Sequence, residues 1–390
     1  MKKSIIVFAT ALLFASSAFA QSQIKWYGFV RNYATCDSHA SSAGTEDLFY
    51  YMPLNNDEKG TSNFVALTSR LGVDVSGYEV EGYKVGAKIE TDFYNKNSQV
   101  AVLRLRQAYL TLAKDTRSWK IGQAWHPMAA DLPDIFSLES AAPFGPFSRT
   151  PQVTFDYGFG NGSSLTASAI WMMQYTPNGP ENSSANYIKY SGIPELYLAY
   201  NAKSEHNLLR LGVDMVNVKP YKNNDGLHTT FNAYIYEQYV NNGWAVKNKL
   251  TYAQDGSHFN LVGGYGVTVA SAGSDKFDYA FTSNVSDWLT ITCKKDKHWA
   301  PALLLGYIKM FAASEEIAPS LFWAKLNAGT VNQMYRIQPE VVYNLGKVAF
   351  GAEYMMTSVQ YGKADAFKAV TDDLHWVTNH RIQLMVKYTF

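Results

Sequence analysis

The sequence has few cysteines and no surplus of charge of either sign. Two cysteines in 390 residues are too few for a disulfide-stapled scaffold. Lysine and arginine total 34 against 33 aspartate and glutamate residues, so no net basic field is present to hold nucleic-acid phosphates. With 17% charged and 15% aromatic residues, the composition is also unlike that of a disordered chain. What is left is a folded protein that does not bind nucleic acid, built either as several domains or as one large closed sheet.

Long apolar runs and the motifs of common catalytic sites are absent as well. After Gln21, no stretch approaches the ~20 continuous apolar residues of a membrane helix. The eight histidines are scattered without ligand spacing, and no His-Glu-x-x-His or Gly-x-Ser-x-Gly motif occurs. The segment Gly263-Gly264-Tyr265-Gly266 lacks the Lys-Ser/Thr of a phosphate-binding loop. We therefore expect neither a helical membrane protein nor an enzyme, and no metal or cofactor.

Residues 1–20 have the pattern of a secretory signal peptide. Lys2 and Lys3 form a basic head, residues 5–14 form an apolar run, and Ala18-Phe19-Ala20 provides a cleavage site of small residues. An apolar run of roughly ten residues is too short to span a bilayer as a helix. We therefore expect an exported chain whose mature part is residues 21–390. Without membrane helices, such a chain is either soluble or crosses the membrane as a closed β-barrel.

Alternation of apolar and polar residues favours the barrel. Near the end of the chain, one face carries Ile382, Leu384, Val386, Tyr388 and Phe390. The other face carries Arg381, Gln383, Lys387 and Thr389, and only Met385 breaks the polar set. A period of two is typical of a strand with one apolar face, and it recurs over residues 63–76, 83–94, 101–113 and 207–218. Strands of about eleven residues suit a membrane barrel, whereas soluble strands are usually about five or six residues long.

The pattern and its turn signals predict an antiparallel barrel of sixteen strands. They are 24–33, 63–76, 83–94, 101–113, 118–126, 151–158, 164–173, 193–201, 207–218, 229–240, 244–254, 281–292, 300–311, 333–343, 347–358 and 380–390. Short periplasmic turns alternate with long outer loops at 34–62, 126–150, 174–192, 254–280, 312–332 and 360–379. The strand-like segment 261–270 is placed in an outer loop because both termini then lie on one side. Eighteen strands is the alternative.

The predicted register makes specific claims about which side chains face lipid. It places Val65, Leu67 and Tyr109 on the outward, apolar face. It also places two acidic residues, Glu237 and Asp287, on that face. Acids facing lipid indicate either a β-bulge or an error in the register at these strands.

Three features of the sequence resemble known outer-membrane proteins. The last strand, with Tyr388 and Phe390, resembles the signal that the barrel-assembly machinery recognises in bacterial outer-membrane barrels. Segment 126–150 resembles the third loop of trimeric general-diffusion porins, although Pro143-Phe144-Gly145-Pro146 departs from their Pro-Glu-Phe-Gly-Gly motif. With Trp26-Tyr27-Gly28-Phe29 opening the barrel and Ile121-Gly122-Gln123-Ala124-Trp125 before that loop, the chain is most similar to the DcaP-like porins.

This resemblance implies a function and a setting. It implies a homotrimer in outer-membrane lipid, with segment 126–150 folded into the pore. It also implies a water-filled channel for passive diffusion of small hydrophilic solutes and ions. Two alternatives stay open: a surface adhesion or scaffold barrel, and a barrel enzyme with an active site at its rim. For the enzyme, His126 near Asp131, or His375 near Asp372 and Asp373, would be the candidate groups.

Sixteen strands enclose a lumen too wide for side chains alone to fill, so we expect water inside it. The predicted register sends more basic than acidic residues inward. The basic residues are Lys25, Arg31, Arg70, Lys84, Lys88, Arg104, Arg106, Lys120, Arg210, Lys247, Lys249, Lys309, Arg336, Arg381 and Lys387. The acidic residues are Asp74, Glu90, Asp92, Asp156, Glu195, Asp214, Glu340 and Glu353. Because charged side chains set pore selectivity, this surplus predicts a mild preference for anions.

A subset of these residues forms the predicted constriction. On the predicted strands these residues are Arg31, Arg70, Lys88, Glu90, Asp92, Arg104, Arg106, Arg210, Asp214, Arg336 and Glu340. In the predicted loop 126–150 they are Asp131, Asp134 and Glu139. Arg70, Arg104 and Arg106 are the foremost candidates, because they lie on nearby strands facing one lumen. An alternative is that these arginines form cross-strand ion pairs with Glu90 and Asp92.

Overall fold

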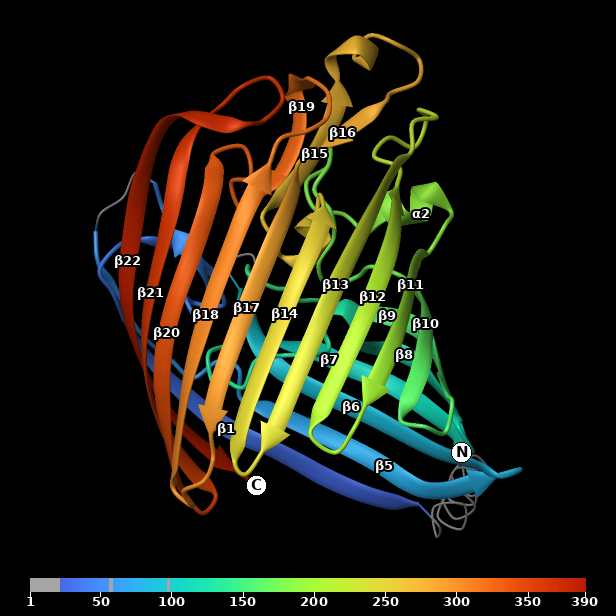
Figure 1. The fold of residues 1–390 in the computed structure, drawn as a ribbon, viewed down its shortest axis with the longest axis vertical. Helices are drawn as coiled ribbons and strands as arrows, with labels where there is room; N and C mark the ends of the chain where they lie inside the picture. The colour runs from blue at the N-terminus through green and yellow to red at the C-terminus, as the bar shows by residue number, and fades with distance from the viewer. Residues whose placement is uncertain (1–21, 56–58, 97–98) are drawn as a thin grey trace, which may run out of the picture.

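The computed structural model of the chain describes residues 22–55, 59–96 and 99–390. The predicted signal peptide lies outside the described residues. Within them, the chain is almost entirely antiparallel β-sheet (Figure 1). None of the described helices is long and apolar enough to cross a membrane.

Sixteen strands form the barrel wall, one of them interrupted. They are β1 (Gln23–Asp37), β4 (Thr61–Val65) continued by β5 (Arg70–Val80), β6 (Tyr83–Lys96), β7 (Gln99–Lys114), β8 (Arg117–Trp125), β9 (Arg149–Gly158), β10 (Ser163–Ile170), β11 (Glu195–Lys203), β12 (Asn207–Val218), β13 (His228–Asn241), β14 (Trp244–Gln254), β17 (Ser283–Cys293), β18 (Trp299–Phe311), β20 (Val331–Leu345), β21 (Val348–Ala364) and β22 (Val370–Thr389). Each predicted strand overlaps one of these, so the sixteen-strand prediction is confirmed and the eighteen-strand alternative is wrong.

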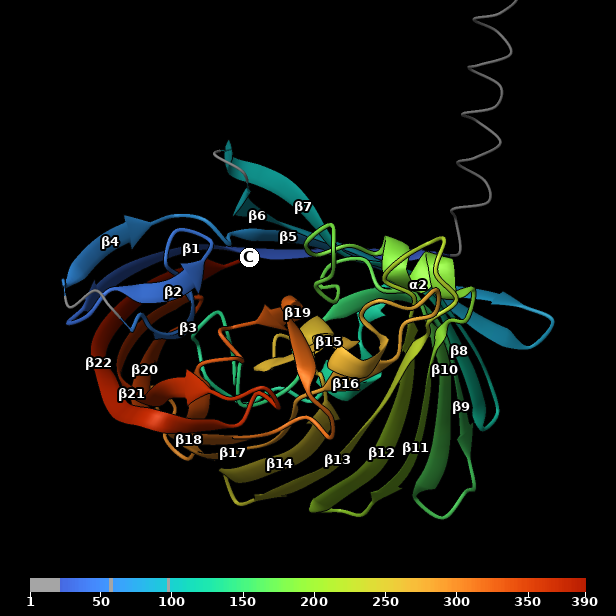
Figure 2. The same ribbon diagram turned by 90° about the horizontal axis from the view of Figure 1, so that it is seen from above.

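The first and last strands close the wall. β1 pairs with β22 from Phe29↔Thr389 to Asp37↔Arg381, and with β5 from Gln23↔Ser76 to Phe29↔Arg70. Closure leaves no long free edge, which is the condition for a sheet to cross a hydrocarbon layer. Viewed along its length, the wall forms a ring around inner segments (Figure 2).

Smaller elements lie at the outer end, opposite the short turns. β15 (Gly263–Thr268), β16 (Tyr279–Phe281) and β19 (Ile317–Lys325) form a separate three-stranded sheet there. The hairpin of β2 (Ser41–Gly44) and β3 (Phe49–Pro53), helix α2 (Asn186–Ser191), and the 3-10 turns η2 (Pro127–Ala129), η3 (Ser257–Phe259) and η4 (Val269–Ser271) complete the described elements. The strand-like segment 261–270 thus lies in an outer loop, as predicted.

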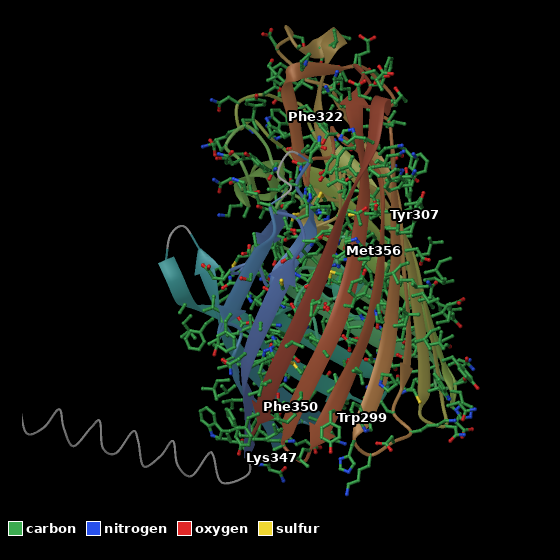
Figure 3. All side chains as sticks on the ribbon, turned by 90° about the vertical axis from the view of Figure 1, so that its left-hand side faces the viewer. Trp299, Tyr307, Phe322, Lys347, Phe350 and Met356 are labelled. Atoms are coloured by element: carbon green, nitrogen blue, oxygen red, sulfur yellow. The ribbon has the colours of Figure 1, made fainter. Side chains whose placement is uncertain are left out.

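Alternation separates the two faces of the wall. On β22, Ile382 and Leu384 are exposed by 56% and 52%, whereas Arg381 and Gln383 are each only 1% exposed. Tyr307 and Phe350 likewise lie on the outer surface (Figure 3). The apolar face therefore points outward and the polar face points into the barrel, as the sequence predicts.

Four parts of the predicted register are wrong. Lys309 shares the outer face of β18 with Leu305 and Tyr307, so it does not point into the barrel. The second strand is interrupted between β4 and β5. Val65 pairs with Tyr33, whose hydroxyl donates to the carbonyl oxygen of Phe136 inside the barrel, so Val65 points inward. Leu67 packs in the same inner cluster. A register shift between Glu90 and Thr91 opposite β7 turns Tyr109 to the inside, where it pairs with Lys88. Finally, β21 and β22 continue to Ala364↔Val370, so most of the predicted loop 360–379 is strand.

The two outward acids follow the register without any irregularity. Glu237 pairs with Asn248, and Asp287 pairs with Leu250, in unbroken ladders. Asn248 donates to the Asp287 carboxylate over 2.8 Å. Neither a bulge nor a register error accounts for them; a neighbouring amide on the outer face satisfies Asp287 instead.

Candidate functional site: the cavity between the inner loop and the wall

The segment between β8 and β9 lies inside the barrel. Phe136 N donates to Glu340 Oε2 over 3.0 Å, and Gln338 Nε2 donates to Ser137 Oγ over 2.7 Å. Two wall glycines make room for its rings. A Cβ at Gly306 would lie 2.6 Å from the Phe144 ring, and one at Gly351 would lie 2.8 Å from the Phe136 ring. We call this segment, residues 126–148, the inner loop.

Each acidic residue of the inner loop meets a basic residue of the wall. Asp131 lies 3.3 Å from Arg210 Nε, Asp134 lies 2.8 Å from Lys247 Nζ, and Glu139 lies 3.6 Å from Arg336 NH1. These partners belong to β12, β14 and β20. The acids therefore fix the loop against one half of the wall.

The Glu139 contact is the most deeply buried of the three. Both Glu139 and Arg336 have fully buried side chains. Burial raises the pKa of Glu139 to about 7, and the charge of Arg336 offsets only part of this effect. Arg336 also donates to the carbonyl oxygens of Ala142, over 3.3 Å, and Tyr51, over 3.0 Å. It therefore anchors the inner loop by main-chain contacts as well as by charge.

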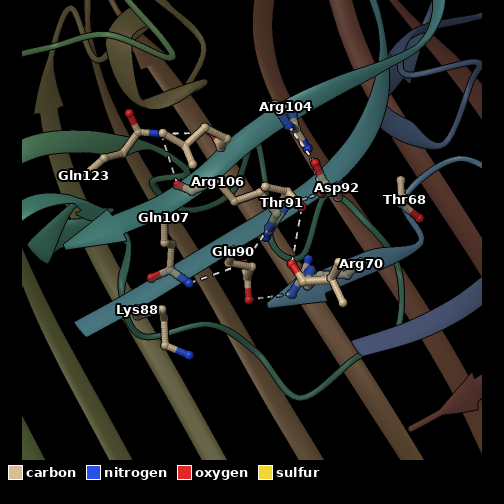
Figure 4. Close-up of polar contacts among 12 residues, drawn as sticks. Thr68, Arg70, Lys88, Glu90, Thr91, Asp92, Arg104, Arg106, Gln107 and Gln123 are labelled. Carbon is tan, nitrogen blue, oxygen red and sulfur yellow. Dashed lines mark hydrogen bonds and ion pairs between the residues drawn. The ribbon is translucent and has the colours of Figure 1, made fainter. Parts of the chain in front are cut away.

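On the other half of the wall, arginines surround two carboxylates (Figure 4). Arg104 makes two hydrogen bonds to Asp92, at 2.9 and 3.0 Å. Arg106 bridges Glu90 at 2.7 Å and Asp92 at 2.5 Å, and Arg70 lies 3.6 Å from Glu90. These arginines form the cross-strand ion pairs, and they also line the cavity described below. Three guanidinium groups share two carboxylates, so the cluster carries surplus positive charge.

Two further arginines add to this charge and have no acidic partner among the residues that the structure describes. Arg31 donates to Thr68 Oγ1 over 3.0 Å and stacks on the Tyr33 ring at 5.0 Å. Arg149 stacks on Trp125 at 4.4 Å. Its Nε and NH1 atoms find no hydrogen-bond partner in the described part of the chain. Both atoms are buried, so Arg149 adds charge to the site rather than open hydrogen-bond donors.

A cavity of about 480 Å³ separates the inner loop from these arginines. Its basic lining residues are Arg31, Arg70, Arg104, Arg106, Arg149, Lys294 and Lys387, and its acidic ones are Asp134 and Glu340. The cavity is also lined by the aromatic rings of Phe49, Trp125, Phe136, Phe147 and Tyr175. The cavity is therefore predominantly cationic and partly aromatic.

Several predicted constriction residues lie elsewhere. Lys88 pairs with Asp74 at 2.8 Å and contacts the Tyr27 hydroxyl at 2.9 Å, away from the cavity lining. Arg210, Arg336, Asp131 and Glu139 contribute to loop anchoring and do not line the cavity. Asp214 belongs to a separate buried cluster with His126 and Glu195.

Sequence reasoning missed Arg149, Lys294 and the aromatic lining. Arg149 falls in the predicted loop 126–150, where alternation makes no claim about which way a side chain points. It is 1% exposed and stacked on Trp125. Lys294 lies in a periplasmic turn. Alternation carries no information about residues at strand ends that loops cover.

Comparison with known proteins agrees with this architecture. The model of the DcaP outer membrane protein family matches residues 14–157. The outer membrane channel DcaP of Acinetobacter baumannii is 21% identical, with a TM-score of 0.75 over 95% of this chain and 98% of that one. No curated protein matches the chain.

More distant structures share the fold. An anion-selective porin from Comamonas acidovorans is 11% identical, with a TM-score of 0.61 over 95% of this chain and 100% of that one. The in-vitro folded OmpT of Vibrio cholerae, in its trimer form, is 11% identical, with a TM-score of 0.54 over 95% of this chain and 99% of that one.

The chain folds as a closed antiparallel β-barrel with the fold of the porins. Within that class its architecture is DcaP-like, as the resemblance in its sequence predicts.

Proposed function

We propose that the barrel is a water-filled channel for the passive diffusion of small hydrophilic solutes and ions. The observation that carries this proposal is the charged cavity between the inner loop and the arginine cluster, inside a closed wall whose outer face is apolar. Charged side chains that line a cavity inside a closed barrel act on the ions and solutes that enter it. Aromatic and polar groups beside the charges suit small solutes of mixed character.

The same cavity supports a mild preference for anions. Its basic lining residues outnumber Asp134 and Glu340, and two further acids, Glu90 and Asp92, neutralise only part of the arginine charge. Lining charge of one sign raises the local concentration of the opposite ion and lowers its barrier to entry. A solute carrying negative charge is therefore favoured over a cation of the same size.

Two measurements on the purified barrel test the proposal. Liposomes that contain it should swell in sugars below a size limit, whereas an adhesion barrel or a rim-active enzyme without a pore would leave them impermeable. In a planar bilayer under a salt gradient, the reversal potential should have the sign of an anion-preferring channel. Impermeable liposomes would refute the channel, and clear cation selectivity would refute the charge argument.

We also propose that the barrel assembles as a homotrimer and is inserted by the barrel-assembly machinery. The porin fold and the trimer form of the Vibrio cholerae OmpT support the first proposal. Tyr388 and Phe390 at the end of the last strand support the second. Native mass measurement in detergent tests the trimer, and a monomeric mass in gentle detergents would argue against it.

A further inference from the structure

A second buried polar cluster lies apart from the cavity, at the start of the inner loop. It combines His126, which directly follows β8, with Glu195 of β11, Asp214 of β12 and His258 of η3. One ligand atom from each of His126, Glu195 and Asp214 lies within 4.8 Å of the other two. His126 Nε2 is 2.7 Å from Glu195 Oε1, and His258 Nε2 is 3.7 Å from the same oxygen. The fold thus gathers two imidazoles and two carboxylates from four separate segments.

The cluster is closed to solvent and poor in compensating charge. Glu195 is 0% exposed and Asp214 2%. Among the described residues, neither carboxylate forms an ion pair with a lysine or arginine. The neighbouring basic residue Lys249 donates to the Met128 carbonyl oxygen instead. Buried carboxylates are stable only when paired, protonated or bound to a metal, so this cluster has to take up positive charge, either as protons on its own groups or as a metal ion.

Unpartnered atoms of the cluster mark where that charge would lie. Glu195 Oε2, Asp214 Oδ1 and His258 Nε2 are buried without a hydrogen-bond partner in the described part of the chain. Asn232 donates to the other Asp214 oxygen over 3.0 Å and leaves its own Oδ1 unpartnered. Buried polar atoms that lack partners call for an explanation, and a bound ion is one that accounts for several of them around one point.

We propose that this cluster binds a divalent transition metal of the zinc class, with His126, Glu195 and Asp214 as ligands and His258 as a fourth donor. Mixed imidazole and carboxylate donors suit Zn²⁺, whereas Ca²⁺ and Mg²⁺ prefer oxygen ligands alone. His126 Nδ1 accepts from Met128 N over 3.1 Å, so the metal-free ring carries its proton on Nε2 and donates to Glu195. Coordination through Nε2 would move that proton to Nδ1 and break the hydrogen bond from Met128 N.

The metal would tie four segments together. His126 begins the inner loop, His258 lies in the outer loop after β14, and the two carboxylates lie on the wall. Binding would therefore fix the inner loop at its root, on the side away from the Arg336 anchor. The sequence predicts no metal site because these residues are far apart in the chain. The proposal is independent of channel function, since binding is measured without any conductance.

The test begins with the wild-type barrel in detergent, stripped of metal and then titrated with Zn²⁺. Equilibrium dialysis with elemental analysis should show about one tight Zn²⁺ per chain. The temperature at which the barrel unfolds, followed by the change in its gel mobility on heating, should rise with Zn²⁺ but not with Mg²⁺. Absence of saturable Zn²⁺ binding to the folded wild-type protein would overturn the proposal and leave protons as the compensating charge.

Matched variants locate the site. Glu195→Gln and Asp214→Asn should each weaken Zn²⁺ binding about tenfold or more. Glu353→Gln, which removes a buried inner carboxyl from a different cluster, should bind Zn²⁺ as the wild type does. Each variant is first shown to be folded by the change in its gel mobility on heating. Tight binding that survives Glu195→Gln would place the ion elsewhere and refute the assignment.

Discussion

Arg149 offers the sharpest test of how the cavity selects ions. It lines the cavity and stacks on Trp125, and it has no acidic partner among the described residues. Arg149→Gln therefore removes one positive charge without leaving a carboxylate unpaired. Arg104 and Arg106 are less suitable, because their removal would also release the charge of Asp92.

The magnitude follows from the size of the cavity. A sphere of about 480 Å³ has a radius of about 5 Å. A unit charge about 5 Å from a passing ion contributes about 0.8 kcal/mol in water, and ~0.1 M salt reduces this to about 0.5 kcal/mol. The effect has opposite signs for anions and cations. Arg149→Gln should therefore lower the anion-to-cation permeability ratio by about 1 kcal/mol, or roughly fivefold. This is a lower bound, because burial reduces the dielectric screening.

The assay is the reversal potential in a planar bilayer under a salt gradient. Lys203→Gln is the control, since it removes an exposed charge at the periplasmic end of β11, outside the cavity lining. The control should keep the wild-type reversal potential, and Arg149→Gln should move it toward zero. Identical potentials in all three proteins would refute the assignment of selectivity to this cavity.

Three other predictions concern the inner loop and assembly. Arg336→Met removes the donors to Ala142 and Tyr51 and leaves Glu139 without its buried partner. It should therefore destabilise the loop contacts by about 3 kcal/mol or more and increase the fluctuations of the single-channel current. A current as steady as that of the wild type would contradict this. The raised pKa of Glu139 means that the folded protein binds its proton more tightly than the unfolded chain does between pH 4.5 and about 7, so stability falls as pH rises through that window. Glu139→Gln should remove this loss of stability, which is about 3 kcal/mol at full extent. The unfolding temperatures at pH 5 and pH 8 should then differ less in the variant than in the wild type. Equal differences in the two proteins would exclude Glu139 as the source of the pH effect. Phe390→Ala should lower the amount of barrel inserted in cells while refolding into detergent micelles proceeds, and normal insertion in cells would show that Phe390 is not part of an assembly signal.

Most of the wall was predictable from the sequence, because a strand between lipid and water must alternate at every residue. Most of the errors occur where the ladder is irregular. One extra residue opposite Glu90 and Thr91 reverses the parity that Tyr109 would otherwise have. Val65 and Leu67 are apolar but face an apolar inner cluster with Met385, which a rule of polar inward faces cannot anticipate.

The site was less predictable than the wall. Alternation identified the inward side of Arg31, Arg70, Arg104 and Arg106, although Arg70 begins β5 after the interruption and Arg106 is the extra residue at the register shift. It could not show that the inner loop packs on Gly306 and Gly351, or that the acidic residues of the loop form ion pairs with basic residues of the wall. Those contacts join residues far apart in the chain, as with Lys247 and Asp134, which are 113 positions apart.

The central claim is that ions cross the barrel through the cavity between the inner loop and the arginine cluster. Ala302 of β18 lines this cavity and is small enough for a cysteine to replace it with little change of volume. In a Cys36→Ser, Cys293→Ser background, single-channel conductance of Ala302→Cys should fall when a bulky thiol reagent is added, and should recover on reduction. A conductance that the attached group leaves unchanged would contradict the account.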